Sequence, residues 1–385
     1  MLKCASLYTT EVDNPEIAVS KINEQIDAKI TLLENSVGII MCHPEFISTG
    51  VLKAVCENLP FDVAGITTSS QAVNSEIGEL MLTIFVMTSD DVRFKTGLTE
   101  NLDCEVDGPI KSAYKRIAAD MSEPPKLAII FPPLGLHSGD MYVDAWGKII
   151  PHIPIFGTCA IDDTTVFSEC ETIHNGTNYK SAMPFVLCYG NINPRFMIAT
   201  PSEKNTVSDK AEITKAAGNC VEQINNDTAI KYFEKLGFTE SVKFTPFMID
   251  LLKREDYDGI PVIRWHAYFT EEGESIFYGD VDEGSTFTML KCDPDDILVT
   301  ARQKLEMLNK LPDVNGVLLF TCTVRRATLS GVNKHLMELQ SAKNMINSEI
   351  PFMMGYSGGE ICPTSVKNDV PTNRFHNYSL VILVI

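Results

Sequence analysis

Three segments of the chain repeat one order of features, and this repetition limits the folds that the sequence can adopt. Each segment opens with a short apolar run, at residues 37–41, 127–131 and 316–320. Runs of this length that are rich in β-branched residues are typical of strands buried on both faces. A polar loop, a segment compatible with a helix and a second apolar run follow each time. The repetition predicts tandem copies of one supersecondary unit.

The segments also end alike. Small polar residues follow Gly65, Gly157 and Gly355, and a last apolar strand then closes each segment. The unit is therefore strand, loop, helix, strand, glycine-containing turn, strand. Such units predict an α/β fold, with α+β as the alternative, in which helices cover layered sheets.

We expect two domains, because the polar stretch at residues 200–209 is the best candidate for a hinge. The expected domains are residues 1–200, with units at about 36–90 and 125–191, and residues 201–385, with the third unit at about 314–385. In the third unit, Ser330 is the expected N-cap of a helix.

The charge balance excludes several classes of function. The chain has 51 acidic and 32 basic residues, a net charge of −19, which disfavours binding to nucleic acid and to anionic membranes. The sequence has no apolar run of the roughly 20 residues that a membrane helix needs and no signal peptide at its N-terminus. Eleven cysteines without a C-x-x-C pair favour reduced thiols. We therefore expect a cytoplasmic protein that does not insert into a membrane.

Standard cofactor motifs are missing. The sequence contains neither G-x-G-x-x-G nor the P-loop pattern, and HExxH and other zinc spacings do not occur. We expect no cofactor and no bound metal.

Polar residues gather at the predicted strand ends of the third unit. Cys322 and Arg325 follow its first strand, where open sheets bind ligands, and an arginine there offers a planar fork to a carboxylate. Glu360, in the glycine-rich turn, offers an acceptor to an amine. Each residue also has a structural explanation, as a surface ion pair, a core thiol or an ordinary turn.

Four further residues complete the predicted pocket. Tyr356 and Gly359 belong to the same turn, and His376 and Asn377 open the last strand. An arginine, a glutamate, a tyrosine and exposed backbone N–H groups together suit a zwitterion such as an amino acid.

These motifs carry a family resemblance. The order Leu-Phe-Thr-Cys-x-x-Arg, Gly-Tyr-Ser-Gly-Gly-Glu-Ile and Phe-His-Asn-Tyr-Ser resembles the C-terminal half of FIST domains. Arg264 and the Val281–Gly284 turn resemble the strand arginine and V-P-E-G turn of that family, with Asp282 in place of the proline. Residues 61–70 are similar to the turn of the FIST N-terminal domain, although Ser70-Gln71 replaces the Gly-Glu that members often carry. The resemblance runs from about Ser36 to the end of the chain.

The resemblance implies an intracellular sensory module for small ligands, with amino acids as a proposed class. It places Arg264 with Cys322, Arg325, Tyr356, Gly359, Glu360, His376 and Asn377 as candidate ligand-binding residues. FIST domains are often attached to output domains, and this chain ends at the last FIST strand, so we expect a separate signalling partner.

Two alternatives stay open. The chain could be a small-molecule enzyme with Cys322 as nucleophile, His376 as base and Glu360 as acid, which would need a lowered thiol pKa. It could also be a scaffold, which would expose a sizeable apolar patch.

Overall fold

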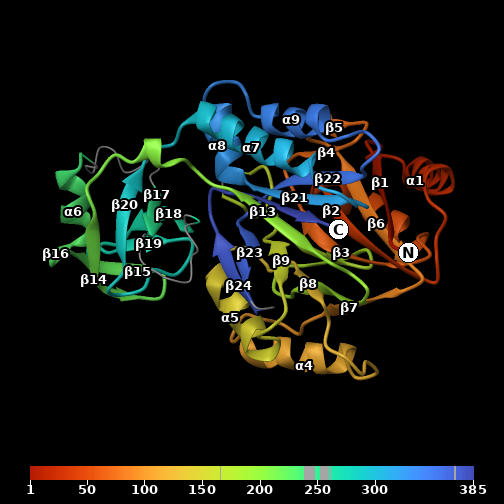
Figure 1. The fold of residues 1–385 in the computed structure, drawn as a ribbon, viewed down its shortest axis with the longest axis horizontal. Coiled ribbons are helices and arrows are strands. Elements are labelled where there is room, and N and C mark those ends of the chain that lie inside the picture. The colour runs from red at the N-terminus through yellow and green to blue at the C-terminus, as the bar shows by residue number, and fades with distance from the viewer. Residues whose placement is uncertain (165, 238–247, 252–259, 261, 368–369) are drawn as a thin grey trace.

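The structure is a computed structural model that describes residues 1–164, 166–237, 248–251, 260, 262–367 and 370–385. The body of the molecule consists of three units with one order of elements (Figure 1). Each unit has an edge strand, a helix, a first central strand, one or two helices, a second central strand, a hairpin and a closing strand. The predicted α/β fold of tandem units is confirmed.

The bounds of the elements show the repetition. The first unit contains β1 (Lys3–Thr9), α1 (Pro15–Lys29), β2 (Asn35–Cys42), α2 (Glu45–Ser48), α3 (Val51–Glu57), β3 (Asp62–Thr67), β4 (Gln71–Val73), β5 (Ile77–Gly78) and β6 (Leu82–Ser89). The second contains β7 (Val92–Leu98), α4 (Asp107–Ile117), β8 (Leu127–Ile130), α5 (Gly139–Ile149), β9 (Ile155–Thr158), β10 (Thr172–His174), β11 (Thr177–Tyr179) and β12 (Pro184–Gly190). The third contains β13 (Arg195–Ala199), α7 (Pro294–Leu308), β21 (Val317–Cys322), α8 (Thr323–Ser330), α9 (Met337–Met345), β22 (Phe352–Ser357), β23 (Glu360–Lys367), β24 (Val370–His376) and β25 (Leu380–Val384).

The three units exchange their hairpins in a cycle. In every unit the two central strands are parallel, and the closing strand lies antiparallel between the first central strand and the edge strand. The second central strand then pairs with a hairpin from another unit: β3 with β10, β9 with β23, and β22 with β4. Each sheet is therefore completed by its neighbour, and a unit on its own would leave a strand edge unpaired.

The inner faces of the three sheets share one core. Successive residues of a strand point to opposite faces, so Leu318 and Phe320 of β21 face this core while Val317 and Leu319 face α7 and α9. Phe320 stacks on Phe156 of the second unit, with ring centroids 5.1 Å apart. Figure 1 shows α1, α4 and α9 on three different sides of the body. This burial on both faces explains why the central strands read as continuous apolar runs.

Residues 200–293 stand between β13 and α7 in the sequence, and those of them that the structure describes form a lobe at one end of the molecule (Figure 1). Its elements are β14 (Ala211–Ala217), β15 (Cys220–Ile224), β16 (Asp227–Thr228), α6 (Ala229–Lys235), β17 (Met248–Leu251), β18 (Val262–Phe269), β19 (Ser275–Phe277) and β20 (Thr286–Leu290). Because β14 pairs with both β20 and β15, the ladder closes into a small barrel. Phe233, Phe277 and Phe287 help to fill its interior.

The polar stretch at residues 200–209 leads from β13 into this lobe. Asp296 at the start of α7 anchors it, because its Oδ2 atom accepts from the Ser202 backbone N–H (2.9 Å) and from Asn205 Nδ2 (2.7 Å). The division of the chain into two domains near residue 200 stays a prediction.

The helix after β21 begins earlier than expected. Cys322 is the N-cap residue of α8, and Ser330 is its last residue, with a hydroxyl that donates to the carbonyl of Arg326 (2.8 Å). The expectation that Ser330 starts a helix is therefore wrong, because the chain enters the helix directly from the strand. Within the described residues, none of the helices has the length and apolar composition to cross a membrane.

Candidate functional site

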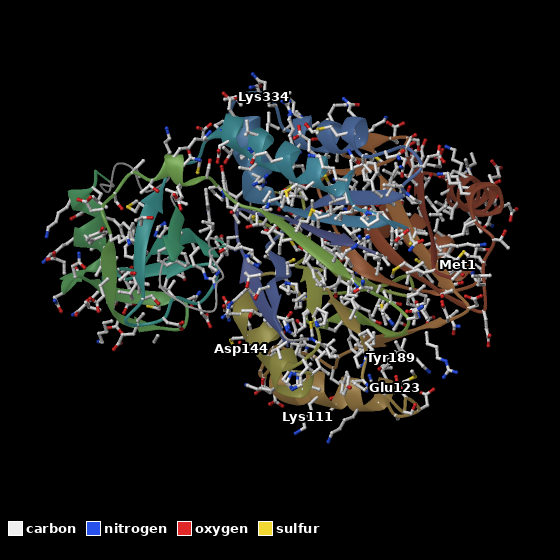
Figure 2. All side chains as sticks on the ribbon, in the orientation of Figure 1. Met1, Lys111, Glu123, Asp144, Tyr189 and Lys334 are labelled. Atoms are coloured by element: carbon white, nitrogen blue, oxygen red, sulfur yellow. The ribbon has the colours of Figure 1, made fainter. Side chains whose placement is uncertain are left out.

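A cavity of about 470 Å³ lies where the lobe meets the body. Figure 2 shows that side chains fill the space between the ribbons of the body, and Lys334 at its upper edge marks the loop after α8. The cavity lies beyond the carboxyl end of β21, the usual position of ligand sites in α/β sheets. Its lining residues are Leu134, Ile161, Asp162, Asp163, Thr164, Phe167, Trp265, Tyr278, Cys322, Thr323, Val324, Arg326, Ala327, Ser330, Gly358 and Asn377.

One face of α8 forms a wall of this cavity. Thr323, Arg326, Ala327 and Ser330 line it and share the three- and four-residue spacing of a helix face. Arg326 donates from Nε to the Ser70 hydroxyl (3.0 Å) and pairs through Nη2 with the Glu79 carboxylate (2.5 Å). The arginine that reaches the cavity is therefore Arg326, the neighbour of the predicted Arg325.

Arg325 lies on the opposite, buried face of α8. Its guanidinium contacts Glu338 Oε1 through Nη2 (2.5 Å) and Nε (3.1 Å), and both side chains are fully buried. The same carboxylate accepts from the Thr321 hydroxyl through Oε2 (3.0 Å). Tyr356 donates to the His335 carbonyl (3.1 Å) and lies 3.5 Å from Glu338 Oε2. Neither Arg325 nor Tyr356 is among the described residues that line the cavity.

Glu360 lies behind Cys322. The Ser357 hydroxyl donates to Glu360 Oε1 (3.0 Å), and burial raises the pKa of this fully buried carboxyl well above its usual value. Cys322 lines the cavity with 3% of its surface exposed. Burial first, and the nearby Glu360 second, raise the pKa of its thiol. In both groups burial favours the neutral form over the charged form.

The remaining predicted residues divide between cavity and core. Asn377 lines the cavity, and its Oδ1 atom accepts from the Trp265 backbone N–H (3.2 Å). His376 is fully buried with Nε2 3.1 Å from the Cys362 carbonyl oxygen, and burial lowers its pKa to about 3. The Gly359 carbonyl accepts from the Cys159 N–H (3.0 Å) and the Thr158 hydroxyl (2.9 Å), which joins the second and third units.

Arg264 connects the lobe to the body. Its guanidinium makes two contacts to the Asp140 carboxylate on α5 (2.9 and 3.0 Å) and also donates to the Phe375 carbonyl (3.0 Å). It is not one of the described residues at the cavity surface.

The structure does not favour the enzyme alternative. Burial shifts the Cys322 thiol pKa in the direction opposite to that which a nucleophile needs. The residues Gly355–Gly359 do fit the pattern G-x-S-x-G, but the strand β22 leads into the hairpin β23–β24 rather than into a helix. A nucleophile elbow requires a strand-to-helix turn, and Ser357 is instead buried against Glu360.

The sequence did not predict the cavity-lining residues of the lobe or of the loop after β9. Trp265 and Tyr278 come from the lobe, and Asp162, Asp163 and Phe167 come from that loop. Had a helix been predicted to begin after Cys322, the spacing of three and four residues would have placed Arg326 on the same face as Thr323 and Ser330. The sequence carries no comparable local signal for the lobe residues, because only the tertiary fold brings them to α8.

The chain matches two models of known protein families. The FIST N domain model matches residues 36–227, and the FIST C domain model matches residues 221–363. Together they cover most of the chain, which therefore belongs to the FIST family. Domains of this family are associated with small-ligand sensory signalling. A comparison with curated proteins finds no significant match.

Replacing Arg325 with alanine should lower the free energy of unfolding by about 3–5 kcal/mol, because the Glu338 carboxylate would stay buried without its partner. Urea denaturation would measure this loss. The control is Lys53→Ala, which breaks an exposed pair with Glu57 and should cost less than about 0.5 kcal/mol. An Arg325→Ala protein as stable as wild type would contradict a structural role for Arg325.

Replacing Glu360 with glutamine should change how stability depends on pH. Burial raises the folded-state pKa of Glu360 above its unfolded value, so its contribution to stability is full below the unfolded pKa and is lost as the pH rises through the folded pKa. Glutamine resembles the neutral acid, so the variant should gain stability relative to wild type as the pH rises from about 5 to about 8. Thermal melting at both pH values measures this gain, with exposed Glu57→Gln as control. A constant difference between variant and wild type would show that Glu360 ionises normally.

Proposed function

We propose that this chain senses an amino acid with an apolar side chain, which binds in the cavity between lobe and body. The observation that carries the proposal is the cavity itself, whose walls come from two parts of the molecule. Its volume of about 470 Å³ falls in the range of small-molecule sites, roughly 300–1,000 Å³.

The walls of the cavity suit a ligand with an apolar part. Leu134, Phe167, Trp265, Val324 and Ala327 all line it. Burying a side chain of the size of leucine against such a surface supplies roughly 1.5–3 kcal/mol.

The polar residues of the cavity carry both signs of charge. Arg326 can bind a carboxylate, and Asp163, half exposed and paired with His43 at 3.4 Å, can accept from an ammonium group. These two residues take the roles that the sequence suggested for Arg325 and Glu360. The net charge of −19 repels a bare anion at long range, whereas a zwitterion avoids this cost.

The proposal includes a separate signalling partner and a cytoplasmic location. The cysteines support the cytoplasmic location. All eleven lie in the described part of the chain, and all are free thiols. Free thiols in this number are typical of a reducing compartment.

Isothermal titration calorimetry with L-leucine tests the proposal, with glycine and 4-methylpentanoate as probes that lack the side chain or the amine. L-leucine should bind more tightly than either. Arg326→Gln should weaken L-leucine binding by roughly 30-fold or more, because it removes a charged contact in a partly buried site. The matched control is Arg302→Gln, a change of the same kind at an exposed position of α7.

Two results would overturn the proposal. One is the failure of L-leucine and of every other apolar amino acid to bind. The other is an affinity for L-leucine that is the same in Arg326→Gln as in wild type.

A further inference from the structure

We infer that Arg264 and Asp140 are positioning residues for the cavity: their ion pair holds the lobe against the body and so sets the affinity of a site that neither residue touches. The inference rests on the proposed ligand site and adds the means by which its two walls are held together. We call the Arg264–Asp140 ion pair the latch.

The latch joins two separate parts of the fold. Arg264 belongs to β18 of the lobe, and Asp140 belongs to the first turn of α5 in the body. Asp140 Oδ2 also accepts from the Asp280 backbone N–H of the lobe (2.8 Å), and Arg264 Nε donates to the Asp280 carbonyl (2.8 Å). One carboxylate of the body is therefore held by two groups of the lobe. The side chain of Arg264 is only 3% exposed, so its charge depends on this partner.

The residue next to Arg264 forms a wall of the cavity. Adjacent strand residues point to opposite faces, so β18 directs Arg264 to the latch and Trp265 to the cavity. The Trp265 ring stacks on Tyr378 of the body, with centroids 5.7 Å apart and planes 5° from parallel. A displacement of the latch therefore moves Trp265 with the same strand.

The cavity needs both of its walls. Trp265 and Tyr278 come from the lobe, whereas Arg326 and Ala327 come from α8 of the body. A molecule with the lobe displaced lacks the wall that Trp265 and Tyr278 form. The measured dissociation constant then rises in inverse proportion to the fraction of molecules whose lobe is closed.

Gly279 offers a way to disturb the latch without removing a charge. A Cβ atom at this position would lie 2.8 Å from Arg264 Nε and 2.9 Å from Asp140 Oδ2, so the pair must shift. Gly147 on α5 is the matched control, because a Cβ atom there meets no described atom within 4 Å. For the charge variant Asp140→Asn, the control is Asp107→Asn. Asp107, on α4, forms an exposed ion pair with Lys148 on α5, the helix that also carries Asp140.

Acrylamide quenching of tryptophan fluorescence in the protein without ligand is the first measurement. Trp265 is 8% exposed and should become accessible when the lobe opens, while Trp146, the other of the two tryptophans, is fully buried in the body. Gly279→Ala and Asp140→Asn should raise the quenching constant of the Trp265 emission about twofold or more. Both controls should match wild type.

Calorimetry with L-leucine is the second measurement. If the disturbed latch leaves about one molecule in ten closed, its dissociation constant should rise about tenfold in both latch variants and stay unchanged in both controls. If the ion pair had a purely structural role, both latch variants would have a lower melting temperature but the same quenching constant and the same affinity as wild type.

The outcomes separate this inference from the proposed function. If L-leucine fails to bind wild type, the proposed ligand is wrong, but the quenching experiment still decides whether the latch holds the lobe. If Asp140→Asn does not fold, Gly279→Ala carries the test. Folded latch variants with wild-type quenching would overturn the inference.

Discussion

The exchange of hairpins among the three units is the constraint on which the rest of the structure depends. β4 and β22 are far apart in the sequence, but their pairing brings the first unit to the carboxyl end of β21. Two hydrogen bonds depend on this approach: Thr68 Oγ1 donates to the Tyr356 carbonyl (2.7 Å), and Arg326 donates to the Ser70 hydroxyl. The cavity is therefore built on contacts among units and cannot belong to any one of them.

The buried arginines Arg325 and Arg264 differ in role from Arg326, which lines the cavity. Arg325 and Arg264 are each enclosed with a carboxylate, because a buried guanidinium without a partner would cost several kcal/mol. These two residues hold α8 and the lobe in place. Arg326 pairs at its outer end with a half-exposed Glu79, so its charge stays close to solvent and to the cavity.

The sequence predicted the central strands of the body well, whereas its ligand-binding residues stay a prediction. The central strands were found because burial on both faces leaves a continuous apolar run, as at Val317–Cys322. Of the residues predicted to bind a ligand, Cys322 and Asn377 line the cavity, and their role in binding stays a prediction. Arg325 was predicted because it follows the end of the strand and completes the Thr-Cys-x-x-Arg motif. In the structure β21 leads directly into α8, where adjacent residues point about 100° apart, so Arg326 faces the cavity and Arg325 does not. Trp265 lines the cavity because the lobe packs against the body, and no local pattern in the sequence predicts that packing.

The central claim is that the cavity between lobe and body is the ligand site. Anomalous diffraction from crystals grown with free L-selenomethionine tests it most directly, because the selenium of this apolar amino acid can be located independently of the protein atoms. The account predicts one anomalous peak in the cavity, between Trp265 of the lobe and Ala327 of α8. A selenium peak elsewhere on the molecule, or none at saturating concentration, would contradict it.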